Sequence, residues 1–366
     1  MKKITTELLY KRQITLKEIG KPGQDRLLQS KVVIVGCGGL GCVAAAYLAG
    51  SGIGSIQLID FDEVNASNLH RQVFYKMEDV GKPKAKVLAS YLKKIAPFSK
   101  INHHELAVVK ENVFELIAEG DIVLDCTDSL PIKYLLNDAC VLKNKTLVYG
   151  SLYKFDGYVS TFNLEFQKGQ FSSNLRDAFP EISKEAIPNC SEVGTLNTIV
   201  GLIGLMQANE VLKIVTQVGN PLIDELLIYN SLENSQYKMK LKRTFSKDMI
   251  QKIFDSESYY DLNCEIQDET LLISSEALKK ELSNSFSNKN LKIISVLENK
   301  DSKPPMNVDQ KLPYSQFQID QIAFAPSNNY IIVCNKGITS YEVLKRIKEK
   351  YPKLNVLSLK GGILNY

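Results

Sequence analysis

A short apolar run that leads directly into a glycine-rich loop constrains the fold of this chain more than any other feature. Residues 31–35 read KVVIV, a β-branched run typical of a buried strand, and the next six residues read GCGGLG. The stretch that follows, LGCVAAAYLAG, has a helix-forming composition. A strand that turns into a helix through glycines lets phosphate approach the free N–H groups of the helix N-terminus. The loop glycines are Gly36, Gly38, Gly39 and Gly41.

Strands and helices alternate along the residues that follow the loop. Strand-like runs occupy 55–60, 121–126 and 146–150, and helical patterns occupy 84–97 and 131–144. This alternation predicts an α/β fold with a Rossmann-like, doubly wound and mostly parallel sheet. A long apolar helix over TLNTIVGLIGLMQANEVLKIV is expected in the core or at a subunit interface.

A change in composition predicts a second domain. The chain has 366 residues, which exceeds one typical domain, and after about residue 240 it becomes polar without clear βα alternation. We expect a first domain over 1–245, a linker over 246–268 and a smaller α/β domain over 269–366. Within the smaller domain, residues 329–362 read as strand, loop, helix and strand.

Charge and cysteine usage exclude several classes of protein. The net charge of +4 is small for this length and gives no case for nucleic-acid binding. The N-terminus lacks the apolar core of a signal peptide, and no run reaches the length needed to span a bilayer, so we expect a cytoplasmic protein without a membrane partner. The seven cysteines are scattered and form no C-x-x-C pair, which argues against a disulfide framework.

Polar residues after the predicted strands identify a candidate nucleotide site. Asp60 closes the second strand about twenty residues after the loop, where an acidic residue binds ribose hydroxyls. To this point an NAD enzyme fits equally well. Arg71, Lys84 and Asp128 follow in SNLHRQ, GKPKAK and DCTD, and cations with a carboxylate at one crevice suit a magnesium triphosphate. Asn68 and Gln72 are placed to contact the nucleotide. Asp62 is expected to cap a turn, Lys82 to be a solvated side chain and Asp125 to hold the local backbone.

Five motifs in one order resemble a known family. LLYKRQI, VGCGGLG, LIDFDEVNASNLHRQ, GKPKA and LDCTDS are similar to the motifs of ubiquitin-activating-like adenylyltransferases, over roughly residues 5–240. The resemblance is to the ThiF/MoeB/HesA type, which activates sulfur carrier proteins for molybdopterin and thiamine synthesis. It implies that ATP and Mg²⁺ bind here. The C-terminal Gly-Gly carboxylate of a small ubiquitin-fold sulfur carrier would then attack the α-phosphate, and an acyl-adenylate would form as pyrophosphate leaves.

The resemblance also implies roles for individual residues. Asp60 would hold the ribose, Arg71 and Lys84 would contact phosphates, and Asp128 would hold Mg²⁺. Arg12, in YKRQ, would reach the phosphates bound by the partner subunit of a homodimer. Alignment and charge neutralisation carry such a reaction, because a carboxylate nucleophile needs no general base.

The chain departs from the family pattern at several positions. Ser129 stands where an asparagine is frequent, and Lys133 stands where an arginine is usual; a lysine cannot form the bidentate fork of an arginine. Many relatives bind a structural zinc through two C-x-x-C pairs. The first pair would fall near 170–180, where no cysteine stands, and the second after MKLKR, where Cys264 stands alone. We therefore predict no zinc.

Two cysteines are candidates for sulfur or acyl chemistry. Cys190 lies in IPNCSEVGTLN, where resembling enzymes often have a cysteine that either bonds covalently to the carrier or is dispensable; both roles stay open. Cys334 ends a predicted strand and opens CNKGITS, a loop whose N–H groups and following helix would cradle an anionic sulfur. The remaining cysteines are expected to be buried: Cys37 as a filler beside the glycines, and Cys42, Cys126 and Cys140 in the core.

The Cys334 loop and the final VLSLKGGILNY resemble the rhodanese sulfurtransferase family, in which this cysteine carries a persulfide. The upstream half matches poorly: SVLEN and KLPYSQF are the nearest equivalents of the Asp-Val-Arg and His-Ile-Pro-Gly segments. We expect adenylation in the first domain and sulfur transfer from a Cys334 persulfide in the second, with a sulfur donor such as a cysteine desulfurase. A degenerate docking module, an adenylating enzyme for a peptide or ubiquitin-like tag, an NAD-dependent oxidoreductase and a non-catalytic scaffold remain alternatives.

Overall fold

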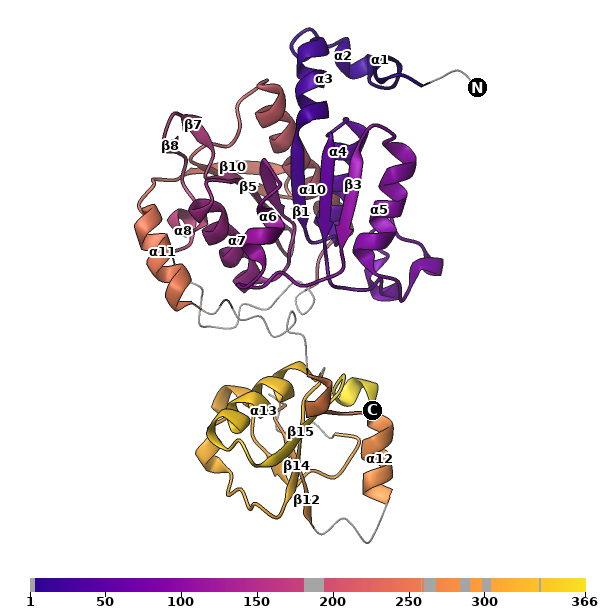
Figure 1. Ribbon diagram of the computed structural model, residues 1–366, viewed down its shortest axis with the longest axis vertical. Coiled ribbons are helices and arrows are strands. Elements are labelled where there is room, and N and C mark those ends of the chain that lie inside the picture. Colours follow the sequence, from indigo (N-terminus) through magenta and orange to yellow (C-terminus); the bar gives the residue numbers. More distant parts are fainter. Residues whose placement is uncertain are drawn as a thin grey trace. The chain divides into compact units, whose positions relative to one another are not determined.

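The computed structural model describes residues 4–180, 194–257, 259, 268–283, 290–297, 304–335 and 337–366 (Figure 1). The chain divides into two compact units, Met1–Asp261 and Leu262–Tyr366. Each unit has its own sheet and its own hydrophobic core, so each is described separately.

The first unit is built on an eight-stranded sheet with the strand order β10-β9-β6-β5-β4-β1-β2-β3. Its parallel part comprises β1 (Lys31–Val35), β2 (Ser55–Ile59), β3 (Lys100–His104), β4 (Ile122–Asp125) and β5 (Thr146–Tyr153). From β1 the chain winds outward through β2 and β3, and from β4 it winds the opposite way through β5. The predicted doubly wound fold is confirmed, and its topological switch point lies between β1 and β4.

Three strands extend this sheet in antiparallel fashion, which the sequence did not predict. They are β6 (Asp156–Phe162), β9 (Glu225–Asn230) and β10 (Ser235–Lys240). Nearly every side chain of β10 is exposed, so its sequence carries no alternation of apolar and polar residues to identify it. A small separate hairpin pairs β7 (Glu165–Gln167) with β8 (Gln170–Phe171).

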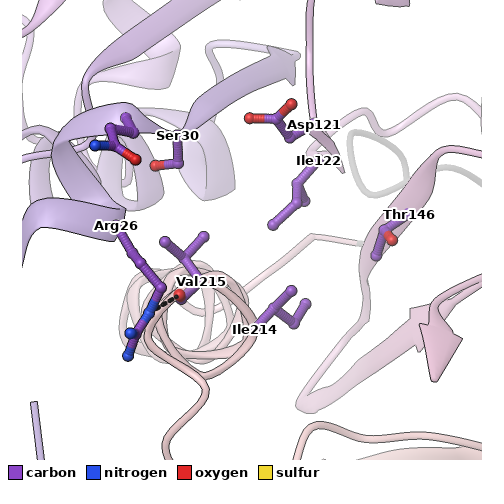
Figure 2. Close-up of a pocket in the computed structure, with 8 residues that line it drawn as sticks. Arg26, Ser30, Asp121, Ile122, Thr146, Ile214 and Val215 are labelled. Carbon is purple, nitrogen blue, oxygen red and sulfur yellow. Dashed lines mark hydrogen bonds between the residues drawn. The ribbon is translucent and has the colours of Figure 1, made fainter. Parts of the chain in front are cut away.

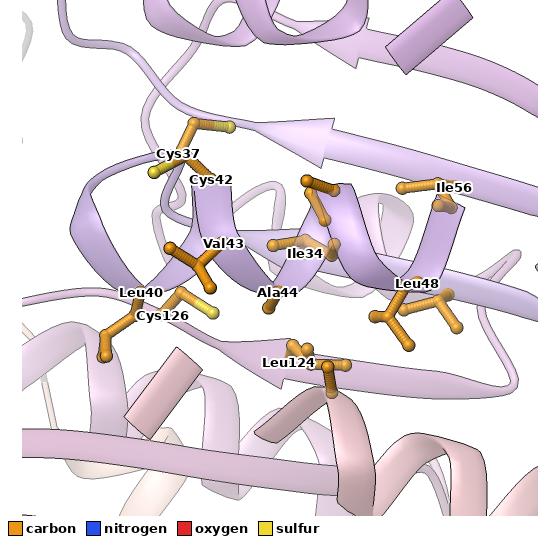
Figure 3. Close-up of a cluster of buried hydrophobic side chains, with 14 of the residues drawn as sticks. Ile34, Cys37, Leu40, Cys42, Val43, Ala44, Leu48, Ile56, Leu124 and Cys126 are labelled. Atoms are coloured by element: carbon orange, nitrogen blue, oxygen red, sulfur yellow. The ribbon is translucent and has the colours of Figure 1, made fainter. Parts of the chain in front are cut away.

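Helices cover the first sheet, and those over 39–50, 84–95, 130–142 and 197–216 lie where the sequence predicted helices. The long ones are α3 (Gly20–Gln29), α4 (Gly39–Gly50), α5 (Lys84–Ile95), α7 (Leu130–Leu142), α10 (Asn197–Thr216) and α11 (Lys247–Ser256). The short ones are α1 (Thr6–Leu9), α2 (Lys11–Ile14), α6 (Val113–Ile117) and α8 (Leu175–Ala178). Helix α4 is buried along most of its length between the sheet and α10, where Val43 and Ala44 pack with Ile34 and Leu124 (Figure 3).

We expected no run of the length needed to span a bilayer, and helix α10 shows that this expectation was wrong. It has 20 residues with a mean hydropathy of 1.4 in its most apolar window, and length and composition alone would let it cross a bilayer. Within the first unit it packs against α4, β5 and β6. Its polar residues Gln207 and Glu210 are buried and hydrogen-bonded inside the protein. Helix α10 therefore contributes one face to the core of the first unit, which agrees with the first of the two places expected for it, the core or a subunit interface.

The segment expected to be a linker over 246–268 begins with a packed helix. Helix α11 lies against α7, and its Phe254 ring contacts those of Phe114, at 5.0 Å between centroids, and Tyr259, at 5.6 Å. Ile250 and Phe254, one helical turn apart, are both buried. The first unit therefore extends to Asp261 rather than to residue 245, because this polar helix still carries one apolar stripe.

The two segments in which the family resemblance would place zinc-binding cysteine pairs are joined in this structure by a carboxylate. One Asp177 oxygen accepts hydrogen bonds from the Thr244 N–H (2.6 Å), the Thr244 hydroxyl (2.8 Å) and the Phe245 N–H (3.0 Å). The other accepts from the Asn174 N–H and side-chain amide, both at 2.8 Å. We call these residues the Asp177 clamp. The donors are hydrogen-bonding groups rather than thiolates, so they do not fit a structural zinc.

The second unit contains a five-stranded parallel sheet in the order β11-β15-β14-β12-β13. Its strands are β11 (Leu272–Ile273), β12 (Leu291–Ser295), β13 (Gln310–Lys311), β14 (Asn329–Val333) and β15 (Asn355–Leu359). Its long helices are α12 (Ser275–Ser283) and α13 (Ile338–Lys350). The strand, loop, helix and strand predicted for 329–362 are confirmed as β14, the Cys334 loop, α13 and β15. The two-residue strands β11 and β13 are too short for a sequence pattern to reveal.

Candidate active site

The glycine loop lies at the switch point because its glycines permit very close backbone contacts. Gly36 has a φ of +92°, and a Cβ added there would lie 2.6 Å from the Cys126 carbonyl oxygen, at the end of β4. A Cβ on Gly41 would lie 1.8 Å from the Gly36 carbonyl oxygen. Side chains at these positions would separate β1, β4 and α4. The loop therefore holds the N-terminus of α4 against the carboxyl ends of β1 and β4, where open α/β sheets bind ligands.

Asp60 follows β2 and holds the glycine loop from one side. Its carboxylate accepts hydrogen bonds from the Cys37 N–H, at 2.6 Å, and the Asp62 N–H, at 2.8 Å. The side chain is buried, and burial raises the pKa of Asp60 to about 6, although the positive charge of Lys84 opposes the rise. Its binding of ribose stays a prediction, and the structure adds a second task, which is to fix the loop backbone.

Lys84, the first residue of α5, is a buried cation beside the loop. Its Nζ donates to the Asp62 carboxylate at 2.7 Å, and its side chain is 6% exposed. Burial alone would lower the pKa of Lys84, but the charges of Asp60, Asp62 and Asp128 outweigh burial and raise it. Lys84 therefore stays positively charged at neutral pH. Asp62, expected to serve a turn, is instead the ion-pair partner of Lys84.

Gln72 presents an unsatisfied buried oxygen beside the glycine loop. The Arg71 and Gln72 N–H groups both donate to the Asn68 carbonyl, at 3.1 and 3.0 Å, so the three residues form one turn. Gln72 is 4% exposed, its Nε2 lies 3.5 Å from where a Cβ on Gly38 would stand, and its Oε1 has no hydrogen-bond partner among the described residues. A buried acceptor without a partner favours a ligand that carries a hydroxyl or amino group, as a nucleoside does.

Arg71 lies on the more exposed side of the same turn. Its guanidinium donates to the Ser67 carbonyl oxygen at 3.2 Å and lies 2.9 Å from Nε2 of His70. Among the described residues it forms no ion pair with a carboxylate. Its positive charge is therefore not neutralised within that part of the chain, and it can serve an anionic ligand.

The two acids of DCTD have different environments. Asp125, at the end of β4, is fully buried and pairs with the buried Lys133, whose Nζ lies 3.1 Å from both carboxylate oxygens and donates to the Gly150 carbonyl at 2.7 Å. Asp125 also accepts from the N–H and hydroxyl of Thr127, at 3.0 and 2.8 Å. The expectation that Asp125 serves local structure agrees with these contacts.

Asp128 is the exposed member of the pair. Its carboxylate has no ion-pair partner in the described part of the chain, and its charge contributes to the raised pKa of Lys84. Hard oxygen ligands suit Mg²⁺, which a protein holds through one or two carboxylates plus substrate phosphates. No group of three or more His, Cys, Asp or Glu that could hold a metal occurs among the described residues. Asp128 fits a magnesium ion that is carried in by a nucleotide.

The structure does not bring Arg12 to the glycine loop of its own chain. Arg12 is exposed on α2, beside Tyr10 and Gln13, and Gln13 donates to the Ser51 carbonyl just after the end of α4. Since α4 has 12 residues and rises about 1.5 Å per residue, its two ends are about 18 Å apart. Cys190 lies outside the described residues, and its role stays a prediction.

A pocket of about 330 Å³ lies at the other end of the sheet (Figure 2). Arg26, Ser30, Asp121 and Thr146 line it, and they come from the amino ends of β1, β4 and β5 or the segments just before them. Arg26 donates to the Val215 carbonyl oxygen at its rim, at 3.1 Å. None of the predicted nucleotide-site residues contributes to this pocket, so it is separate from the candidate active site.

The four cysteines that the structure describes in the first unit are packing residues. Cys37, Cys42 and Cys126 lie around the start of α4 (Figure 3). Cys140 is buried in α7. Burial raises the pKa of each thiol, to about 12 for Cys42. Thiols that stay protonated at neutral pH are poor nucleophiles, in agreement with the prediction that these four fill space.

Cys334 lies in a loop whose donors converge on its sulfur. The Sγ atom accepts hydrogen bonds from the N–H groups of Gly337, at 3.1 Å, and Ser340, at 3.3 Å, and lies 3.3 Å from the Ser340 hydroxyl. Gly337 has a φ of +81° and precedes the first residue of α13. The cradle predicted for an anionic sulfur is therefore present.

The final glycine pair packs against this loop. A Cβ on Gly337 would lie 2.7 Å from the Gly361 nitrogen, and Gly361 and Gly362 have φ values of +70° and +66°. The Ile363 N–H donates to the Cys334 carbonyl at 2.9 Å. The two motifs on which the rhodanese resemblance rests are therefore contiguous in space.

Sequence reasoning missed Gln207, which also supports the switch point. Its side-chain amide donates to the Asp125 carbonyl oxygen at 2.8 Å, and its Oε1 lies 3.5 Å from Sγ of Cys126. A Cβ on Gly150 would meet this side chain at 2.3 Å. The signal was a glutamine within an otherwise apolar helix, because a buried amide needs partners.

Comparisons with known proteins match both parts of the chain. The ThiF family model matches residues 10–249. A sulfur carrier protein adenylyltransferase from Thermus thermophilus is 39% identical over 64% of this chain and 87% of its own length. An adenylyltransferase and sulfurtransferase, MOCS3 from Drosophila sechellia, is 31% identical over 97% of this chain and 81% of its own length.

A further relative matches part of this chain, and the solved structures show a likeness of fold alone. The probable adenylyltransferase/sulfurtransferase MoeZ of Mycobacterium tuberculosis is 36% identical over 68% of this chain, and the match spans 64% of MoeZ. Among solved structures, E. coli MccB superimposes with a TM-score of 0.58 at 23% identity, over 66% of this chain and 73% of MccB. A likeness at that identity supports the fold of the first unit and nothing beyond it.

Proposed function

The chain belongs to the ThiF family, and we propose that it adenylates the C-terminal carboxylate of a small ubiquitin-fold sulfur carrier protein and then exchanges a carboxylate oxygen for sulfur. Relatives that cover its first unit, or nearly all of it, bear the names sulfur carrier protein adenylyltransferase and adenylyltransferase and sulfurtransferase. The observation that carries the proposal is the exposed Asp128, free of an ion-pair partner among the described residues, beside the buried cation Lys84 at the switch-point glycine loop.

In the first step the site aligns the carrier carboxylate with the phosphates of ATP and neutralises their negative charges. The glycine-loop N–H groups, Arg71 and Lys84 bind the phosphates of ATP, while Asp60, Asn68 and Gln72 hold the nucleoside. The carrier carboxylate attacks the α-phosphorus, the bond to the β-phosphate oxygen breaks, and pyrophosphate leaves with that electron pair. Asp128 would hold a magnesium ion, which would neutralise negative charge at the phosphates. No side chain has to remove a proton, since the attacking group is already ionised.

Arg12 acts in trans within a homodimer in this proposal. It is exposed and about one helix length from the glycine loop of its own chain, which supports a role at the site of another copy. A guanidinium from the partner would add a positive charge where pyrophosphate departs. Each site would therefore be incomplete without a second chain.

In the second step a Cys334 persulfide supplies the sulfur. A donor such as a cysteine desulfurase transfers a sulfur atom from its own persulfide to the Cys334 thiolate, and the donor thiolate leaves. The terminal sulfur attacks the acyl carbon, the bond to AMP breaks, and the carrier is joined to Cys334 through an acyl disulfide. A thiol then attacks the Cys334 sulfur, which releases the thiocarboxylate and leaves a disulfide that a cellular thiol reduces. A Cys190→Ala variant decides between Cys190 and an external thiol as the attacking group.

Carrier-dependent exchange between ATP and labelled pyrophosphate tests the adenylation. The full chain is mixed with Mg²⁺, ATP and a ubiquitin-fold carrier that ends in Gly-Gly from the same cell. We expect exchange by the native protein and a loss of more than about 100-fold in Asp128→Asn. The matched control Glu78→Gln, an exposed acid in the first unit, should keep the native rate. Absent exchange together with NADH binding would favour an oxidoreductase, and an Asp128→Ala variant that stays folded and fully functional in cells would favour a scaffold.

The cytoplasm is the compartment that fits this proposal, because ATP, a carrier protein and thiol reductants meet there. The buried packing of α10 agrees with a protein that does not use this helix to cross a membrane.

A further inference from the structure

A pair of buried serines lies behind the Cys334 sulfur. Ser340, in the first turn of α13, and Ser358, on β15, have no exposed surface. The Ser358 hydroxyl lies 2.8 Å from the Ser340 hydroxyl, which in turn lies 3.3 Å from Sγ of Cys334. Ser340 is the last residue of CNKGITS, and Ser358 lies in the final VLSLKGGILNY, so each of the two segments that resemble rhodaneses supplies one serine.

The need of each buried hydroxyl for a hydrogen-bond partner fixes which group donates and which accepts between Ser358, Ser340 and Cys334. A serine hydroxyl has one proton, and a buried hydroxyl that donates to nothing is destabilising. Within the described residues, the Ser358 hydroxyl has only Ser340 as a partner, so it donates to the Ser340 oxygen. The single proton of Ser340 is then left for the Cys334 sulfur. That sulfur receives three donors: the N–H groups of Gly337 and Ser340 and the Ser340 hydroxyl.

We propose that Ser358 is a positioning residue for sulfur transfer, which acts through Ser340 to keep a hydroxyl donor directed at the sulfur of Cys334. The inference rests on the proposed sulfur step. Cys334 carries negative charge as the thiolate that accepts a sulfur atom from the donor, and again when its sulfur is released from the disulfide. Hydrogen bonds to an ionised acceptor are the strong ones, so a fixed third donor stabilises both forms.

Alkylation of Cys334 by iodoacetamide tests the proposal without the carrier or ATP. Its rate in the full chain, followed by mass spectrometry of the Cys334 peptide at one pH, reports the reactivity of the thiolate. Removal of one directed donor should slow alkylation by about 3- to 10-fold in Ser358→Ala, as a typical single hydrogen bond would. Ser340→Ala should slow it at least as much.

The double variant distinguishes positioning from a general loss of stability. If Ser358 acts through Ser340, the double variant Ser340→Ala with Ser358→Ala should react at the rate of Ser340→Ala alone. Independent structural damage would multiply the two effects. Tyr330→Phe is the matched control, because it removes a buried hydroxyl that accepts the Ala325 N–H at the far end of β14. It should keep the native rate.

Two results would overturn the role of Ser358: a native alkylation rate in Ser358→Ala, or multiplied effects in the double variant. Failure of the sulfur step itself would be seen separately. A Cys334→Ser chain that still produces carrier thiocarboxylate would refute the proposed function, while the alkylation series would still decide whether Ser358 acts on the sulfur.

Discussion

At the scale of single residues, Asp125 and Asp128 show how one short motif supplies two functions. The sequence indicates that acids occur at the end of a strand, and the resemblance favours Asp128 as the metal ligand. Their environments could not be predicted, because burial of Asp125 depends on Lys133 and Gly150, which lie 8 and 25 residues further along the chain. The structure makes Asp125 a structural partner and leaves Asp128 available to a ligand.

The two acids should therefore respond differently to the same substitution. Asp125→Asn leaves the buried ammonium of Lys133 without a counter-charge, which should cost about 3–5 kcal/mol and lower the thermal midpoint by several degrees. Asp128→Asn should leave the midpoint within about one degree, because an exposed acid without a partner contributes little to stability. Thermal unfolding followed by circular dichroism measures both, and equal midpoints for the two variants would contradict the assignment.

The raised pKa of Asp60 leads us to expect that the stability of the folded chain depends on pH in a defined direction. Its pKa is raised from 3.8 to about 6 in the folded chain, so between these values the folded state holds a proton that the unfolded state has released. Stability conferred by this residue should therefore fall as pH rises from about 4 to 6, by on the order of 3 kcal/mol.

Denaturant unfolding of the native chain and of Asp60→Asn across pH 3.5 to 7 measures the contribution of Asp60. The native chain should lose stability relative to the variant as pH rises through this window. Parallel curves for the two proteins would show that the buried carboxyl does not titrate as described.

At the scale of elements, the strands that could be predicted from the sequence were ones with a buried apolar run. The strands β1, β2, β4 and β5 were expected because each carries a buried apolar run. β10 and β3 were missed because most of their side chains are exposed or only half-buried. Helix α11 was missed because its composition is polar, although its buried residues recur at helical spacing.

The Asp177 clamp predicts stability without zinc. Asp177→Ala removes three hydrogen bonds to the segment after β10 and two to Asn174 at the start of α8, and it should cost about 2–4 kcal/mol. The exposed Asp248→Ala is the control and should cost less than about 0.5 kcal/mol. A zinc chelator should leave the thermal midpoint of the native chain unchanged. Stoichiometric zinc in the purified protein, or a chelator-induced fall in the midpoint, would contradict this description.

At the scale of the whole molecule, two units join an adenylation site and a persulfide loop in one chain. A reactive adenylate is hydrolysed unless its sulfur donor is near, and a tether raises the effective concentration of that donor. The sequence predicted both units and their order, because each carries its own motif. The sequence of one chain does not show which of its residues serve a second copy. Arg12 is the residue for which a motif indicated such a role.

Mixing of two inactive variants tests the dimer. In a heterodimer of Arg12→Ala and Asp128→Asn, the site in the Arg12→Ala chain keeps its own Asp128 and receives Arg12 from the partner. Random association of equal amounts should restore about a quarter of the native exchange rate, since half the dimers are mixed and each has one intact site. A mixture that stays inactive, after subunit exchange has been confirmed, would contradict action in trans.

The intact mass of the carrier protein after reaction tests the whole sequence of steps most directly. The full chain is incubated with ATP, Mg²⁺, a persulfide donor and a ubiquitin-fold carrier that ends in Gly-Gly, and the carrier is weighed by mass spectrometry. The proposed function predicts a gain equal to the exchange of one oxygen for one sulfur, lost in both Asp128→Asn and Cys334→Ala. A carrier that gains sulfur equally in the Cys334→Ala reaction, or that is only adenylated by the native chain, would contradict it.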